Sequence, residues 1–105
     1  MSAARTPGAV RVPQVLDIGA ALEVYYSRLT LANADICRLF GRRLAGETLA
    51  KLRRLAREQM DAMGIIPTNP SAISTAAAYT AWGLDVAEME RRWRGLQRMK
   101  KGAAE

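Results

Sequence analysis

The chain has 105 residues, with 16 lysines and arginines against 10 aspartates and glutamates, which gives a formal net charge of +6. This length allows one domain with a modest core and excludes a second one. Because the chain has no histidine and only one cysteine, Cys37, an intrachain disulfide and a zinc site with the usual ligands are excluded. No stretch resembles a signal peptide or a membrane span, so we expect a cytoplasmic protein.

The first two elements expected are an arm and a helix. Residues 1–16 combine Ala, Gly, Pro and Val without any periodicity, which predicts a flexible N-terminal arm. Asp17 is a good capping residue, and a first helix is expected to begin there. The apolar residues that follow at helical spacing, and that we expect on its buried face, are Ile18, Leu22, Tyr25 and Leu29.

Two further helices are expected on either side of a basic turn. A short helix, capped by Thr30 or Asn33, ends at Gly41, and residues 42–46 form the turn. A longer amphipathic helix then runs from about Glu47 to Met63. The residues expected on the buried faces of these two helices are Ile36, Leu39, Phe40, Leu49, Leu52, Leu55, Ala56 and Met63, with Cys37 as an inert thiol beside them.

The last part of the chain predicts two more helices. The fourth begins at Asn69, because Pro70 suits the first helical position, and it ends at Gly83. The fifth begins at Asp85 with an acidic capping box. No strand-like alternation occurs, so the chain predicts an all-α fold, a compact bundle of about five helices. This helical domain is expected to span residues 17–101, followed by a disordered tail at 102–105.

The segment from Asn33 to Leu52 resembles the helix-turn-helix of bacterial and phage DNA-binding proteins, among them small prophage-type regulators. Ile36, Phe40 and Gly41 match the buried positions and the turn glycine of that family. Leu49 and Leu52 match the apolar positions that seat the recognition helix, although the turn before Leu49 is longer than in the family. The resemblance implies a bundle that places the third helix in the major groove of DNA.

The function that this resemblance implies is sequence-specific binding of double-stranded DNA, by a small transcriptional regulator or recombination-accessory factor. Acidic and basic side chains on the exposed face of the third helix would contact base edges, and the arginines of the turn would hold phosphates. The residues expected to bind DNA are Arg42, Arg43, Glu47, Thr48, Lys51, Arg54 and Arg57.

The fifth helix offers two more surfaces. Its cationic side, expected to contact phosphates or a partner, consists of Arg91, Arg94, Arg98 and Lys101. An apolar seam of Met89, Trp93 and Leu96 is expected to pack within the chain or across a homodimer.

An alternative function stays open at this point. In it, the chain is a protein-interaction adaptor or antitoxin-like partner whose basic helices bind an acidic protein. An enzyme is not expected, because the chain lacks a histidine base and a clustered pair of carboxylates. No cofactor, metal, membrane or small-molecule substrate is expected either.

Overall fold

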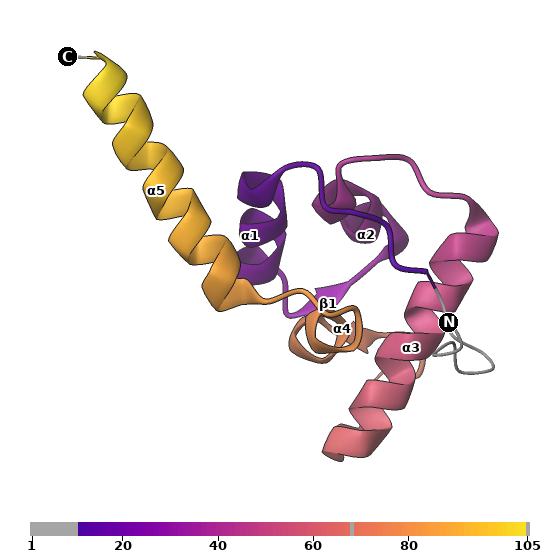
Figure 1. Ribbon diagram of the computed structural model, residues 1–105. Helices are drawn as coiled ribbons and strands as arrows, with labels where there is room; N and C mark the ends of the chain where they lie inside the picture. Colours follow the sequence, from indigo (N-terminus) through magenta and orange to yellow (C-terminus); the bar gives the residue numbers. More distant parts are fainter. Residues whose placement is uncertain (1–10, 68, 105) are drawn as a thin grey trace, which may run out of the picture.

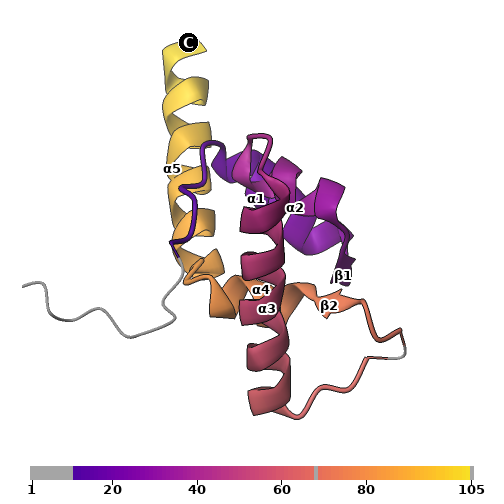
Figure 2. The same cartoon turned by 90° about the vertical axis from the view of Figure 1, so that its right-hand side faces the viewer.

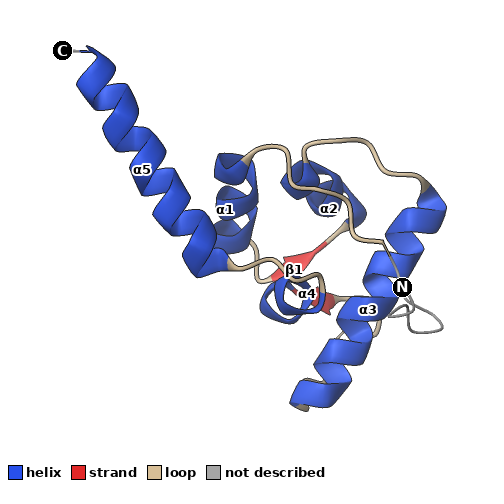
Figure 3. Ribbon diagram, viewed as in Figure 1, coloured by secondary structure: helices blue, strands red, loops and turns tan. Residues whose placement is uncertain are grey.

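The computed structural model describes residues 11–67 and 69–104. These residues form five helices and a small two-stranded sheet (Figures 1 and 3). In chain order the elements are α1 (Ile18–Ser27), β1 (Thr30–Leu31), α2 (Asn33–Phe40), α3 (Gly46–Met63), β2 (Ile73–Ser74), α4 (Thr75–Ala81) and α5 (Val86–Ala104). The prediction of a mostly helical domain is confirmed, whereas residues 1–10 of the expected arm and residue 105 of the expected tail lie outside the described residues.

Several helix ends lie where their polar side chains and glycines predict. The side chain of Asp17 accepts a hydrogen bond from the backbone N–H of Gly19 at 2.9 Å, which caps α1. Gly41 and Gly64, each with φ of 73°, end α2 and α3 in the left-handed conformation that glycine adopts most easily. Asp85 caps α5 by accepting from the backbone N–H of Glu88 at 3.1 Å. Local sequence signals therefore determine these boundaries.

The sheet was not expected from the sequence. Its strands are antiparallel and pair Thr30 with Ser74 and Leu31 with Ile73. A strand of two residues is too short to show alternation, so no local pattern predicts it. Because the chain leaves α1 after Ser27 to enter β1, Leu29 lies outside the helix and is 91% exposed. Its expected place on the buried face of the first helix is wrong.

The predicted start of the fourth helix is also wrong. Residues 69–71 form a turn in which the Asn69 side chain accepts from the backbone N–H of Ser71 at 3.0 Å. Helix α4 begins only at Thr75, and Ser74 caps it by accepting from the N–H of Ala77 at 3.2 Å. Pairing of residues 73 and 74 in β2 delays the helix by one turn and more.

The core is shared by α1, α2, α3 and α4. The largest side chains that are completely enclosed include Tyr79, Phe40, Ile36, Leu39 and Leu52. The predicted burial of α2 is thereby confirmed. On α3, however, Leu49 is only half-buried and Met63 is exposed, and the buried face runs instead through Leu52, Ala56 and Met60.

The two ends of the described chain differ from expectation. Val12 and Val15 pack against the core, and the backbone N–H of Leu16 donates to the carbonyl of Phe40 at 3.4 Å. Residues 12–16 therefore lie along the domain. At the other end α5 continues through residues 102–104, which were expected to be disordered. Its second half extends beyond the other helices (Figures 1 and 2). Within the described ranges no helix is long and apolar enough to cross a membrane.

Candidate nucleic-acid interface

Helix α3 forms one side of the molecule. It packs mainly on α4 and β2, with Leu52, Ala56 and Met60 on its buried face. The opposite face is turned outward, and Figure 2 shows α3 in front of the other elements when the molecule is viewed from that side. Residues 41–45 lead from the end of α2 into this helix. The turn and the outer face of α3 therefore form one continuous surface.

A tryptophan links α2 to α3 behind this surface. The indole N–H of Trp82 donates to the carbonyl oxygen of Leu52, in the middle of α3, at 2.9 Å. The same ring lies 5.6 Å, between centroids, from the ring of Phe40 at the end of α2. Because Trp82 is buried, this hydrogen bond is shielded from water and fixes α3 with respect to the rest of the core.

The outer surface is basic. Arg42 and Arg43 are exposed in the turn, and Lys51, Arg54 and Arg57 are exposed on α3. These five cations share the surface with two carboxylates, those of Glu47 and Glu58. The surface therefore has an excess of positive charge, which attracts a polyanion.

Two ion pairs run along this face of α3. The ammonium of Lys51 lies 3.2 Å from a carboxylate oxygen of Glu47, and the guanidinium of Arg54 lies 3.9 Å from Glu58. Both pairs join residues four positions apart, and all four side chains are at least half exposed. Such pairs contribute about 0.3–0.5 kcal/mol and are screened by salt. Their cations can therefore exchange a carboxylate for another acceptor at small cost.

The seven residues expected to bind DNA are brought together only in part. Arg43, Glu47, Lys51 and Arg54 lie exposed along the turn and the outer face of α3, whereas Thr48 is half-buried. Arg42 is exposed as well, and its guanidinium donates to the carbonyl of Gln14 at 3.4 Å. The last of the seven, Arg57, lines a polar cleft of about 620 Å³ beside the turn at 69–72.

The cations of α5 lie elsewhere. Figure 1 shows α5 and α3 on opposite sides of the molecule, with α1 and α2 between them. Arg91 is paired with Glu88, and Arg94 lines a groove against α1. Arg98 and Lys101 lie on the part of α5 that extends away from the domain. The predicted cationic side of α5 is therefore separate from the basic face of α3.

The seam predicted on α5 is largely used inside the chain. Met89 is buried in the core. Trp93 is half-buried and packs so closely on Gly19 of α1 that a methyl group at position 19 would lie 2.8 Å from the indole. Leu96 retains 40% of its exposure.

Arg53 is a residue of this region that the sequence does not single out. One of its terminal nitrogens lies 3.4 Å from both the carbonyl of Leu31 and the side-chain oxygen of Asn33, and the other donates to the carbonyl of Ser71. Burial lowers the pKa of Arg53, and the neighbouring Arg57 lowers it further. Arg53 thus connects α3 with the start of α2 and with the turn at 69–71. In the sequence it is one arginine of an adjacent pair, and only the tertiary structure separates its role from that of Arg54.

No group of three side chains suited to metal binding occurs in residues 11–67 and 69–104. Comparison of the chain with protein-family models, with curated proteins and with solved structures finds no match.

Proposed function

We propose that this protein binds double-stranded DNA sequence-specifically, using α2 and α3 as a helix-turn-helix. It would act as a small transcriptional regulator or recombination-accessory factor. The observation that carries the proposal is the excess of cations on the outer face of α3 and in the turn before it. Neutralising phosphates with lysine and arginine releases counterions, and this supplies much of the affinity of such proteins for DNA.

The residues of the face divide by position. Lys51 and Arg54 project from the first turns of α3, where a helix lying in the major groove meets base edges. A guanine offers two acceptors to either side chain, and a cytosine amino group can donate to Glu47. Arg42 and Arg43 precede the helix and would bind phosphates, which sets the register of the helix on the duplex.

The rigidity of α3 is a second reason for the proposal. A reading helix has to hold its side chains in place, and rigid elements do so better than loops. Trp82 and Arg53 hold α3 from two sides, through hydrogen bonds to Leu52 and to the segments around residues 31–33 and 71. The outer face of α3 is therefore supported by the core from which it projects.

The test is a gel-shift experiment with genomic fragments, with and without competitor DNA, followed by measurement of affinity on the selected site. Arg54→Gln is expected to weaken binding by about 1–3 kcal/mol and to relax preference at one base position. The matched control is Arg92→Gln, since Arg92 is also exposed and pairs with a glutamate four residues away, Glu88, at 2.8 Å. It removes the same charge from α5, and we expect less than about a twofold change because salt screens distant charges.

Three outcomes separate the candidate functions. Selection of one fragment over competitor, with a loss confined to Arg54→Gln, supports sequence-specific binding. Equal losses in both variants indicate attraction by net charge alone and contradict the proposal. If neither variant changes the affinity for any duplex while Arg54→Gln disrupts a complex with an acidic protein, the adaptor function is correct instead.

A further inference from the structure

The second half of α5 lacks a partner within the chain. From Leu96 to Gly102 every residue is exposed, and two of them are large and apolar: Leu96, 40% exposed, and Met99, 72% exposed. No carboxylate occurs from residue 91 to 104, so this half is also strongly basic. A helical segment of this length is marginal in water without packing. The segment is therefore suited to a surface that is apolar and acidic.

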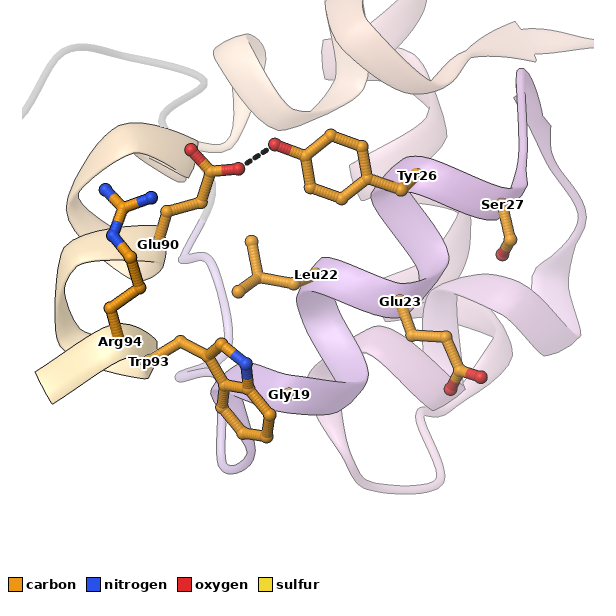
Figure 4. A pocket seen from close by; sticks show the side chains of 8 residues that line it. All are labelled: Gly19, Leu22, Glu23, Tyr26, Ser27, Glu90, Trp93 and Arg94. Atoms are coloured by element: carbon orange, nitrogen blue, oxygen red, sulfur yellow. Dashed lines mark hydrogen bonds between the residues drawn. The ribbon is translucent and has the colours of Figure 1, made fainter. Parts of the chain in front are cut away.

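A groove of that character lies beside the first half of the same helix. It has a volume of about 470 Å³ and is formed by α1 and α5 (Figure 4). Leu22 lies between Tyr26 and Trp93, and two carboxylates, Glu23 and Glu90, border them. The Tyr26 hydroxyl donates to Glu90, which keeps one carboxylate at the edge of the groove.

We propose that a second copy of the chain fills this groove, and that the second half of each α5 docks antiparallel against the α1–α5 groove of the other copy. The charge distribution along α5 determines the direction. Its first half carries Glu88 and Glu90, and its second half carries Arg98, Lys100 and Lys101. An antiparallel pair joins opposite charges, whereas a parallel pair would place like charges side by side.

The lengths of the two segments agree with this arrangement. At about 1.5 Å per residue, the segment from 95 to 104 is about 15 Å long, close to the length of α5 that borders the groove. If the two helices cross between Trp93 and Leu96, Lys101 of one copy comes close to Glu88 and Glu90 of the other. Leu96 and Met99 then cover Leu22 and Trp93, and the contact is the same in both directions, as a two-fold dimer requires.

The dimer is expected to be in equilibrium with the monomer, since an interface built on two short helical segments is small. It does not depend on DNA binding. Helix α3 lies on the opposite side of each copy and stays free in the dimer (Figure 1).

Sedimentation equilibrium over a range of concentrations tests the proposal. The wild-type mass should rise from that of the 11.5 kDa chain toward about twice this value, 23 kDa. Glu90→Lys and Lys101→Glu should each weaken association by about tenfold, because each reversal acts twice in a symmetric dimer. The double variant Glu90→Lys/Lys101→Glu restores opposite charges at both contacts and should recover the wild-type affinity. Asp61→Lys, on the exposed end of α3, is the matched control and should change nothing.

The proposal is overturned by any of three results, with the fold of each variant checked by circular dichroism. The first is a wild-type chain that stays monomeric at about 1 mM, beyond the range of weak specific association. The second is a dimer that Leu96→Glu leaves intact, because the interface then lies elsewhere. The third is a double variant that associates no better than its single parents. None of these results bears on the test of DNA binding, which uses α3.

Discussion

Tyr79 is the largest completely enclosed side chain, and its polar end is satisfied by one bond. Its hydroxyl donates to the carbonyl oxygen of Ala21 in α1 at 2.7 Å, and its ring packs against Tyr25 at 4.9 Å between centroids. Burial raises the pKa of this tyrosine above its ordinary value of 10.0, and the nearby Tyr25 and Asp35 raise it further. Tyr79 thus joins α4 to α1 only while it carries its proton.

This bond predicts an alkaline limit to stability. Because the pKa of Tyr79 is higher in the folded chain than in the unfolded chain, its contribution is complete below pH 10 and is lost as pH rises toward the folded pKa. We expect Tyr79→Phe to lower the free energy of unfolding by about 1 kcal/mol at neutral pH. The gap between wild type and variant should close as pH rises above 10, which urea unfolding at a series of pH values measures. A gap that stays constant there would contradict the account.

The helices differ in how far local sequence determines them. The ends of α1, α2, α3 and α5 depend on neighbouring residues, such as the Asp17 cap and the glycines at 41 and 64, so the sequence predicts most of them. Helix α4 depends on a distant partner. Its first residues follow β2, and β2 exists because residues 73 and 74 pair with residues 30 and 31. Neither the shorter α4 nor the exposed Leu29 can be read from a local pattern, because both follow from that pairing.

The start of α4 provides a test at this scale. Ser74 is both the last residue of β2 and the cap of α4, where its hydroxyl oxygen accepts from Ala77. Ser74→Ala should lower the free energy of unfolding by about 1 kcal/mol, the usual value of a lost N-terminal cap. Ser27→Ala, at the exposed C-terminal end of α1, is the matched control and should stay within about 0.5 kcal/mol of wild type. Thermal or urea unfolding compares the two, and equal effects would show that Ser74 does not cap α4.

The whole molecule carries its positive charge on two separate surfaces. One is the outer face of α3 with the turn before it, and the other is the second half of α5 on the opposite side (Figures 1 and 2). The sequence shows both as basic helical faces, but their separation follows from the fold. The sequence likewise does not distinguish Arg53, which is used inside the domain, from Arg54, which is available to a ligand. A helix-turn-helix that reads DNA through α3 therefore leaves α5 for a different contact.

The salt dependence of DNA binding tests this division of charge. Arg43 lies in the turn and is expected to bind a phosphate, so Arg43→Gln should weaken binding to all duplexes alike. The slope of log affinity against log salt concentration should fall by about one unit. Arg98→Gln removes the same charge from the second half of α5, which lies away from α3, and should leave the slope unchanged. Fluorescence anisotropy between about 50 and 200 mM salt measures both slopes. If Arg98→Gln lowers the slope as much as Arg43→Gln does, α5 also contacts DNA, and the two basic surfaces act on one duplex.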